Sequence, residues 1–156
     1  MDYFPSQNVV KTTLPEAEII FSRFVLSHVN PEDIFEMHKK FKKDFAAGTH
    51  IIHFISPSDL RQHGDKSISL QDFLKYSKEE WSKIMTKFDY HNRLRLPQFI
   101  KIFKTLEYEI VYTSFDSVEP NSSNHKLFKK LEIHEDYKNF TEQELTAGNI
   151  IIVLKV

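Results

Sequence analysis

The sequence predicts an α/β fold, in which a sheet of about four strands is flanked by helices. Three observations support this prediction: an apolar run at residues 19–25, an amphipathic helical pattern at 30–45 and a second apolar run at 50–55. A strand, a helix and a strand in this order form a right-handed crossover with parallel strands. The chain is therefore expected to contain two parallel strands joined by a helix.

The first strand and the helix after it have clear local signals. Residues 19–25 are almost continuously apolar, which is typical of a strand covered on both faces. Asn30 is suited to cap the helix, and Pro31 occupies its first position. Gly48 is expected to end the helix. The inward-facing positions, at helical spacing, are Ile34, Met37, Phe41 and Phe45.

The rest of the chain contains shorter elements. Residues 1–16 are expected to be irregular, apart from a short extended segment at 8–13. A polar loop at 57–68 follows the second strand. The later elements are a short helix at about 69–76, a helix opened by a capping box of Ser77 and Glu80, a helix starting at Pro97, a strand at 109–115, a capping box of Thr141 and Glu144, and a strand at 149–155. The whole chain, 1–156, is expected to form a single domain.

Composition excludes several functional classes. The 21 basic and 22 acidic residues leave a net charge of −1, which provides no field to attract nucleic acid or an anionic membrane. Because cysteine is absent, disulfides, thiolate zinc sites and cysteine nucleophiles are excluded. The longest apolar run, Ile150 to Leu154, is far shorter than the ~20 residues of a membrane helix. We expect a cytoplasmic protein that binds neither nucleic acid nor membranes.

Glycine usage excludes two nucleotide-binding motifs. A loop that cradles phosphate groups needs closely spaced glycines. Gly48, Gly64 and Gly148 lie too far apart to form either the dinucleotide fingerprint or the Walker loop. The sequence therefore contains neither motif.

The end of the first strand is a candidate ligand site, because open α/β sheets bind ligands at the carboxyl ends of their strands. Ser22, Arg23 and Phe24 end this strand, and Ser27 and His28 follow. His28 has two interpretations. It faces a cofactor or substrate, or it helps to cap the helix and fix the turn.

The second strand offers a further histidine and an acid. His50 and His53 are three residues apart on a strand, so their side chains point to opposite faces and do not form a metal pair. His53 is either a core histidine with a hydrogen-bond partner or a catalytic one. Asp59, in the following loop, is either a carboxylate for the substrate or an ordinary loop acid. We predict no metal site.

The segment "YHNRLRLP" at 90–97 suggests an anion site. Leu96 precedes a proline and favours an extended backbone, which would place Arg93 and Arg95 on one side of the segment. Two guanidinium groups together suit a carboxylate or a phosphate, as in an acidic sugar or a phosphorylated substrate. The alternative is that both arginines pair with nearby glutamates.

The order of these segments resembles a known family. "AEIIFSRFVLSHVNPEDIFEMHKKFKKDFAAGTHIIHFIS" at 17–56 resembles the fourth strand, the following helix and the fifth strand of class I S-adenosylmethionine-dependent methyltransferases. "VLSHV" at 25–29 and "AAG" at 46–48 are the counterparts of the family's turn and helix end, and "NIIIVLKV" resembles its last, antiparallel strand. The later segments, including "NRLR", are similar to methyltransferases of small molecules and glycans from bacterial polysaccharide clusters. The resemblance covers about residues 8–156 and implies a partial Rossmann-like methyltransferase sheet.

The resemblance implies a cofactor, an acceptor and a set of site residues. The cofactor is S-adenosylmethionine, and the methyl acceptor is a small molecule or a glycan. The implied residues are Ser22, Arg23 and Phe24 for cofactor binding, His28 and His53 for catalysis, and Asp59, Asn92, Arg93 and Arg95 for substrate binding.

The resemblance also implies a truncated, methyltransferase-like protein. The family's first three strands, with their glycine-rich loop and ribose-binding acid, have no counterpart here, so this chain alone should bind the cofactor weakly or not at all. In the family the fourth strand lies beside the first, so strand 19–25 would present an unpaired apolar edge. We expect the N-terminal segment, a second copy in a homodimer or a partner chain to cover it. The alternatives are a non-catalytic interaction or glycan-binding module, or one part of a split enzyme.

Overall fold

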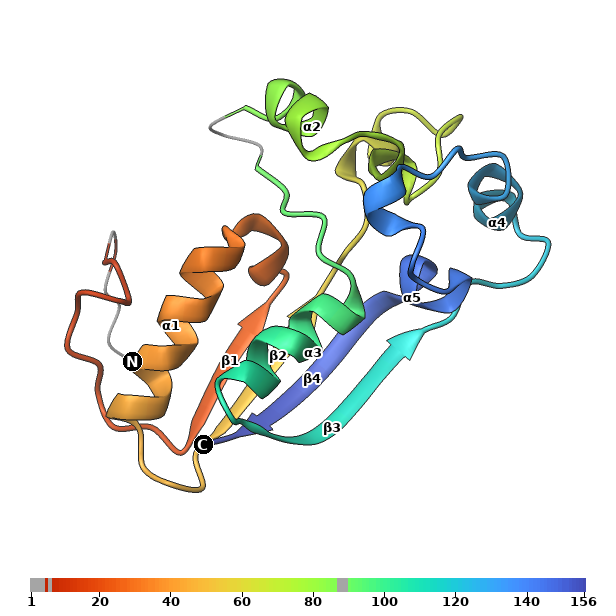
Figure 1. Cartoon of the computed structure of the whole chain (residues 1–156). Coiled ribbons are helices and arrows are strands. Elements are labelled where there is room, and N and C mark those ends of the chain that lie inside the picture. The colour runs from red at the N-terminus through yellow and green to blue at the C-terminus, as the bar shows by residue number, and fades with distance from the viewer. Residues whose placement is uncertain (1–4, 6, 87–89) are drawn as a thin grey trace.

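Four strands form one mixed sheet (Figure 1). The computed structural model describes residue 5 and residues 7–86 and 90–156. The strands are β1 (Ile19–Arg23), β2 (His50–Ile55), β3 (Glu109–Asp116) and β4 (Gly148–Lys155), in the sheet order β1-β2-β4-β3. β1 and β2 are parallel, and β4 runs antiparallel between β2 and β3. The predicted α/β class, the parallel pair and the antiparallel last strand are confirmed.

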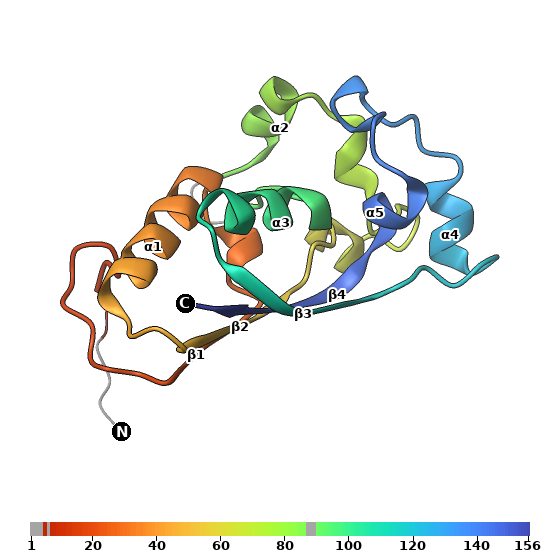
Figure 2. The same cartoon turned by 60° about the horizontal axis from the view of Figure 1, so that its bottom comes forward.

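The described helices all lie on one side of the sheet (Figure 2). The α-helices are α1 (Pro31–Asp44), α2 (Lys78–Ile84), α3 (Leu96–Thr105), α4 (Ser123–Phe128) and α5 (Glu142–Thr146). Short 3-10 helices are η1 (Leu26–His28), η2 (Leu60–His63), η3 (Asp72–Lys75) and η4 (Glu135–Tyr137). α1 and α3 lie along the strands, and the others gather beyond the carboxyl end of β2.

The start of α1 follows the sequence prediction, but its end does not. The Asn30 side chain accepts a hydrogen bond from the Glu32 backbone N–H at 3.0 Å, and Pro31 lies in the first turn. The helix ends at Asp44, earlier than predicted. Gly48 instead turns the chain into β2 with a φ of +97, a conformation that favours glycine.

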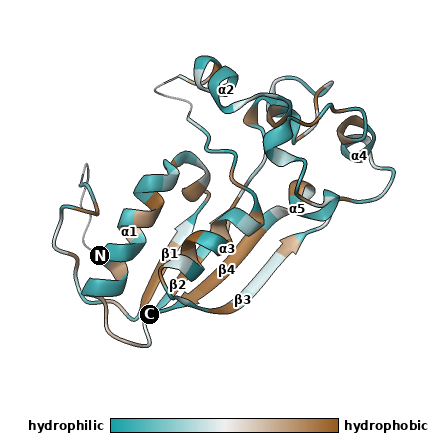
Figure 3. Ribbon diagram, in the orientation of Figure 1, coloured by the Kyte–Doolittle hydropathy of each residue, from teal (hydrophilic) through white to brown (hydrophobic). Residues whose placement is uncertain are grey.

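The main core lies between the sheet and the helices α1 and α3. The burial of each of its large side chains stabilises the fold by roughly 1.5–3 kcal/mol. β4, brown in Figure 3, is more hydrophobic than β3, because alternate β4 residues enter this core. The buried members are Leu26, Ile34, Phe41, Ile51, Ile55, Phe99, Phe103, Tyr108, Ala147, Ile150, Ile152 and Leu154.

A second hydrophobic cluster stabilises the helical lobe, which we define as residues 57–84 and 117–147. Both predicted capping boxes are present here, Ser77 with Glu80 at α2 and Thr141 with Glu144 at α5. The helix predicted at about 69–76 is only the short η3. The buried members of the cluster are Phe73, Leu74, Trp81, Phe128, Tyr137 and Leu145.

The face of the sheet opposite the helices is apolar and uncovered by any described residue (Figure 2). On this open face Phe21 pairs in register with Ile52, and Ile52 pairs with Val153. Ile19 is 63% exposed and Phe21 58%. The prediction that strand 19–25 is covered on both faces is therefore wrong for the described chain, whereas the predicted unpaired edge is confirmed, because β1 pairs only with β2.

The N-terminal segment packs beside α1 and not over β1 (Figure 1). The backbone N–H groups of Lys11 and Thr12 donate to the Asn8 carbonyl, so a turn replaces the extended segment predicted at 8–13. Val9 and Leu14 pack against the main core. In the described part of the chain, this segment leaves the edge of β1 free.

Candidate functional site

β1 ends in a strained turn at the carboxyl end of the parallel pair. Phe24 has a φ of +57, a left-handed conformation that costs a non-glycine residue about 1 kcal/mol or more. Its backbone N–H donates to the Phe54 carbonyl at 2.7 Å, which fixes the turn against β2. The chain then passes through η1 into α1. The turn therefore lies where the sequence predicts a ligand site.

Asn92 fixes a second segment to this turn. Its side-chain amide donates to the carbonyls of Leu26 at 2.6 Å and Val29 at 2.7 Å. Its Oδ1 accepts a hydrogen bond from the Leu94 backbone N–H at 3.0 Å. Asn92, predicted to bind substrate, thus uses its side chain to connect two loops.

His28 is exposed beside this segment. Its Nδ1 lies 3.0 Å from the carbonyl oxygen of Tyr90, which can only accept, so Nδ1 carries the proton of the neutral ring. Nε2 then has a free lone pair and has no hydrogen-bond partner in the described residues. The structure therefore brings His28 and Asn92 together, and His28 can accept a proton from a ligand.

His53 belongs to a different, buried chain of hydrogen bonds. His38 Nδ1 lies 2.7 Å from the Ile34 carbonyl and must donate to it, so His38 Nε2 is an acceptor. His53 Nε2 lies 2.8 Å from that atom and therefore carries a hydrogen. His53 Nδ1 must then accept from the Ser22 hydroxyl, 2.6 Å away. One backbone carbonyl thus sets the protonation of all three side chains.

Burial keeps both of these hydrogen-bonded histidines neutral. Burial lowers the pKa of His38 to about 4, although the hydrogen bond to the Ile34 carbonyl acts in the opposite direction. Burial, and then repulsion by His38, lowers the pKa of His53 well below its ordinary value. Both ring nitrogens of His53 form hydrogen bonds, and the residue is only 1% exposed. These contacts agree with the first of the two interpretations, a core histidine with hydrogen-bond partners.

Arg23 and Phe24 line a hollow of about 620 Å³ on the open face. The Arg23 guanidinium lies 4.7 Å from the centre of the Phe24 ring, and the Phe21 and Phe54 rings beside them meet edge to face at 5.5 Å. An arginine among aromatic rings suits a ligand with a carboxylate and an apolar part. The structure thus places two of the three predicted cofactor residues together, whereas Ser22 faces the helices.

Arg93 has a structural role. Its Nη1 donates to the carbonyls of Phe73 at 2.9 Å and Tyr76 at 2.7 Å, and its Nη2 donates to that of Ser77 at 3.3 Å. The backbone of Arg93 has a φ of +60, and the residue is almost fully buried. Arg93 therefore holds η3 and the start of α2 in place.

Arg95 is buried more deeply and also binds backbone. Its Nε, Nη1 and Nη2 donate to the carbonyls of Arg93 at 3.2 Å, Leu145 at 3.2 Å and Pro57 at 2.6 Å. Burial lowers its pKa to about 10. No acid in the described residues forms an ion pair with either arginine, so the predicted glutamate pairs are wrong. The predicted shared anion site is not formed, because both guanidinium groups are occupied by carbonyls.

Asp59 is an ion-pair partner and a cap. It is 1% exposed and accepts from the Arg61 side chain through both oxygens, at 3.0 and 2.6 Å. It also accepts from the Arg61 backbone N–H at the start of η2. Arg61 contacts Asp72 as well, at 3.1 Å. Asp59 thus matches its predicted alternative, a loop acid.

His91 is a site residue that sequence reasoning did not identify. It is 4% exposed and precedes Asn92, next to His28, with ring centres 5.7 Å apart. The sequence contained a signal for it, because polar residues alternate at positions 91, 93 and 95. The structure buries all three. The predicted extended pattern, continued one step toward the N-terminus, includes this histidine.

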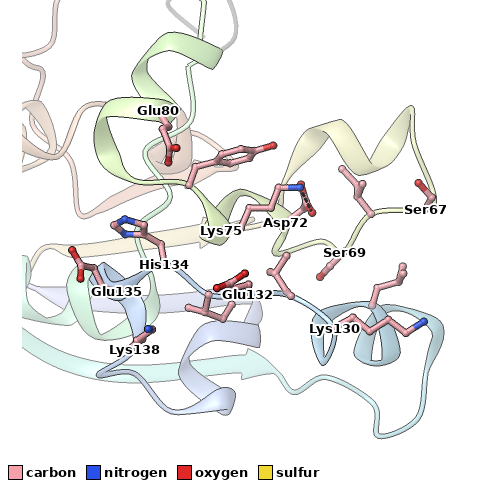
Figure 4. A pocket seen from close by; sticks show the side chains of 15 residues that line it. Ser67, Ser69, Asp72, Lys75, Glu80, Lys130, Glu132, His134, Glu135 and Lys138 are labelled. Atoms are coloured by element: carbon pink, nitrogen blue, oxygen red, sulfur yellow. Dashed lines mark hydrogen bonds and ion pairs between the residues drawn. The ribbon is translucent and has the colours of Figure 1, made fainter.

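A further cleft of about 790 Å³ lies in the helical lobe (Figure 4). Its labelled side chains include both acids and bases, and Lys75 pairs with Asp72 on the same wall, within η3. This mixture favours no single class of ligand. Within the described chain, no group of three or more histidines and acids is placed to hold a metal ion. No helix there is long and apolar enough to cross a membrane.

Comparisons with known proteins identify the fold. No family model and no curated protein matches the chain. It is similar to a solved SAM-dependent methyltransferase from Methanosarcina mazei, with 12% identity and a TM-score of 0.53 over 96% of this chain and 64% of that one. It is also similar to a putative methyltransferase from Bacillus halodurans, with 10% identity and a TM-score of 0.53 over 96% and 69%. An O-methyltransferase family 2 protein from Planctomyces limnophilus, solved with apigenin, matches with 10% identity and a TM-score of 0.50 over 96% and 33%.

At these identities the likeness shows the fold alone. The chain has the Rossmann-like α/β fold of S-adenosylmethionine-dependent methyltransferases. It spans from 33% to 69% of the length of these solved structures.

Proposed function

We propose that this chain is a methyltransferase-like protein that forms the acceptor side of an S-adenosylmethionine-dependent site. The observation that carries the proposal is the arrangement of the sheet. A parallel pair is followed by an antiparallel last strand inserted between β2 and β3. The chain shares its fold with solved methyltransferases over 96% of its length.

The described residues fit only part of S-adenosylmethionine. Arg23 suits its carboxylate, and the rings of Phe24 and Phe54 suit an apolar part of the molecule. With three widely spaced glycines, the chain has no loop to cradle the nucleoside. We therefore propose weak cofactor binding by this chain alone.

His28 is the residue we propose as the base. When bound, the cofactor supplies an electrophilic methyl group on a sulfonium sulfur. Methyl transfer depends mainly on positioning, and the acceptor's hydroxyl or amine must lose a proton. His28 Nε2 is exposed and free to take that proton. His53 and Arg95, which are buried with all their polar atoms occupied, are left out of the proposed site.

Calorimetric titration with S-adenosylmethionine tests the proposal. We expect a dissociation constant on the order of 0.1–1 mM for the wild-type chain, weakened further in Arg23→Met. Lys101→Met, an exposed charge change on α3, is the matched control. Low-micromolar binding would show that this chain holds the whole cofactor. No heat at millimolar ligand would favour a non-catalytic protein.

A second function, an interaction module or one part of a split enzyme, is favoured by the open face. Large contiguous apolar patches on a protein surface commonly mark interaction sites. The free backbone groups of β1 can pair with another strand, and the exposed Ile19 and Phe21 lie beside them. We propose that a second copy or a partner chain covers this edge.

Phe21→Lys is expected to reduce self-association or partner binding in sedimentation velocity. It should change stability by less than about 1 kcal/mol, because Phe21 is 58% exposed. Tyr112→Lys, 53% exposed on β3 at the other edge, is the matched control and should have the smaller effect. A wild-type chain that sediments as a clean monomer, with rapid amide exchange along 19–25, would contradict the homodimer.

A further inference from the structure

The free edge of β1 presents a regular set of backbone groups. Successive N–H groups of a strand point to opposite edges. The Glu18 carbonyl accepts from the His50 N–H at 2.9 Å, and the Phe24 N–H donates to the Phe54 carbonyl at 2.7 Å. The even-numbered positions of β1 therefore face β2, and its odd-numbered residues direct their N–H and carbonyl groups to the free edge. These residues are Ile19, Phe21 and Arg23.

The two edges of the sheet differ in how they are protected. β3, at one edge, departs twice from regular pairing, between residues 110 and 112 and between 114 and 116. Irregularities of this kind, like edge lysines and prolines, keep an edge from pairing with another chain. β1, at the other edge, pairs with β2 in unbroken register and exposes Ile19 and Phe21. Among the described strands, β1 is therefore the edge suited to accept another strand.

The free backbone groups are arranged symmetrically about Phe21. β1 has 5 residues, and the left-handed turn at Phe24 ends it directly after Arg23. When two β1 strands pair antiparallel with Phe21 opposite its own copy, Ile19 of each strand lies opposite Arg23 of the other. In an antiparallel ladder, alternate opposing residues exchange two hydrogen bonds each. This register therefore satisfies every free N–H and carbonyl group of the edge in both copies.

The charges at the two ends of β1 favour the antiparallel orientation. Glu16 and Glu18 precede the strand, Arg23 ends it, and all three are exposed. An antiparallel neighbour places the acids of one copy beside the arginine of the other, whereas a parallel neighbour would place like charges together. Phe21 would meet its own copy at the centre, and aromatic cross-strand pairs stabilise sheets. The edge is thus complementary to itself in both hydrogen bonding and charge.

We infer that two copies of this chain form a symmetric dimer, in which their β1 strands pair antiparallel with Phe21 opposite Phe21. The pairing joins the 4-stranded sheets of both copies into one continuous sheet. Both copies use the same surface, as a two-fold axis requires. The inference rests on the second proposed function, the interaction module, and it selects a second copy of this chain as the partner.

An exchange of charges at Phe21 tests the symmetry of the dimer by sedimentation velocity. The wild-type full chain should sediment as a dimer. Phe21→Lys and Phe21→Glu each place two like charges opposite one another, so each variant alone should raise the dimer dissociation constant about tenfold or more. An equimolar mixture of the two should dimerise again, because opposite charges then face each other. Tyr112→Lys and Tyr112→Glu, at an exposed position on β3, are the matched controls and should dimerise like the wild type, alone or mixed.

Single cysteines test the register, since the chain has no cysteine of its own. Ile19→Cys and Arg23→Cys should form a mixed disulfide when the two variants are combined, because opposing residues of a hydrogen-bonded pair have Cα atoms ~5.5 Å apart. Ile19→Cys alone should form none, since its two copies would lie ~14 Å apart along the strands. Both variants keep Phe21, so this measurement decides the question even if the charged variants fail to fold.

Three results would overturn the inference. They are a wild-type chain that stays monomeric at all concentrations, Phe21 variants that dimerise as well alone as when mixed, and a disulfide in Ile19→Cys alone, which would indicate parallel pairing. A monomeric wild-type chain would exclude the second copy but not a different partner chain. The titration with S-adenosylmethionine measures the cofactor site separately, so failure of the dimer and failure of the methyltransferase proposal are distinguishable.

Discussion

The free energy of unfolding is expected to fall steeply as the pH drops below about 6.5, the ordinary pKa of histidine. Three buried histidines are responsible. Burial lowers the pKa to about 4 for His38, to about 3 for His91 and well below the ordinary value for His53. Between these values and 6.5 the unfolded chain binds more protons than the folded one. Stability is therefore complete above pH 6.5 and is lost as the pH falls toward 4 and then 3.

The expected loss is large compared with the stability of a typical domain. Each histidine contributes up to ~1.4 kcal/mol per pH unit, so three contribute ~4 kcal/mol per unit and roughly 6 kcal/mol between pH 7 and pH 5. Domains of this size are stable by about 5–15 kcal/mol in total. Urea unfolding followed by circular dichroism at pH steps from 7.5 to 4.5 measures the slope.

The geometry of the histidine pair explains why acid should act first between α1 and the sheet. One hydrogen lies between two Nε2 atoms 2.8 Å apart, one on α1 and one on β2. A second proton on either ring would place two N–H groups, and a positive charge, in this buried contact. His38→Met should reduce the slope by about a third, since one of three histidines is removed. His63→Gln, at an exposed position, should leave the slope of unfolding free energy against pH unchanged. A slope near zero in the wild-type chain would contradict the buried neutral pair.

Much of the fold could be predicted because its signals are local. The strand predicted at 50–55 is found at His50–Ile55, and the capping boxes at Ser77 and Thr141 depend on residues three positions away. The parallel pairing follows from the strand, helix, strand order alone. By contrast, the apolar run at 19–25 predicts a strand covered on both faces, whereas the described chain covers only one face. An apolar pattern shows which surfaces tend to be buried, and not whether this chain supplies the cover.

The candidate site was harder to predict because its partners are distant in sequence. The sequence predicts that Arg93 and Arg95 lie on one side of their segment. Their acceptors are backbone carbonyls up to 50 residues away, and because every residue has a carbonyl, the sequence does not mark them. His38 is not among the predicted inward positions of α1, and its partner His53 lies on a strand 15 residues away. The positions of Ser22, His28 and Asp59 in the sequence suggest a site, but their separate roles follow only from their contacts in the structure.

Arg95→Met is expected to lower the free energy of unfolding by at least ~3 kcal/mol. Arg95 is 1% exposed, and its three nitrogens donate to carbonyls of three segments, at Pro57, Arg93 and Leu145. Methionine fills much of the space but leaves these acceptors without donors, at ~1–3 kcal/mol each. Removing a buried charge offsets part of this cost, because desolvation of the guanidinium no longer opposes folding.

The three carbonyls also determine how the protein should unfold. Pro57 and Leu145 belong to the helical lobe, whereas Arg95 leads directly into α3 over the sheet. Loss of the guanidinium should therefore let the lobe unfold before the sheet. Trp81 fluorescence reports on the lobe and far-ultraviolet circular dichroism on the whole chain, so their urea midpoints should separate in Arg95→Met and coincide in the wild type. Arg95→Lys should separate them too, because one ammonium cannot reach three dispersed acceptors as the guanidinium fork does. Arg23→Met, at an exposed position, is the matched control. If Arg95→Met had the same urea midpoint as this control, the buried guanidinium would add nothing to stability.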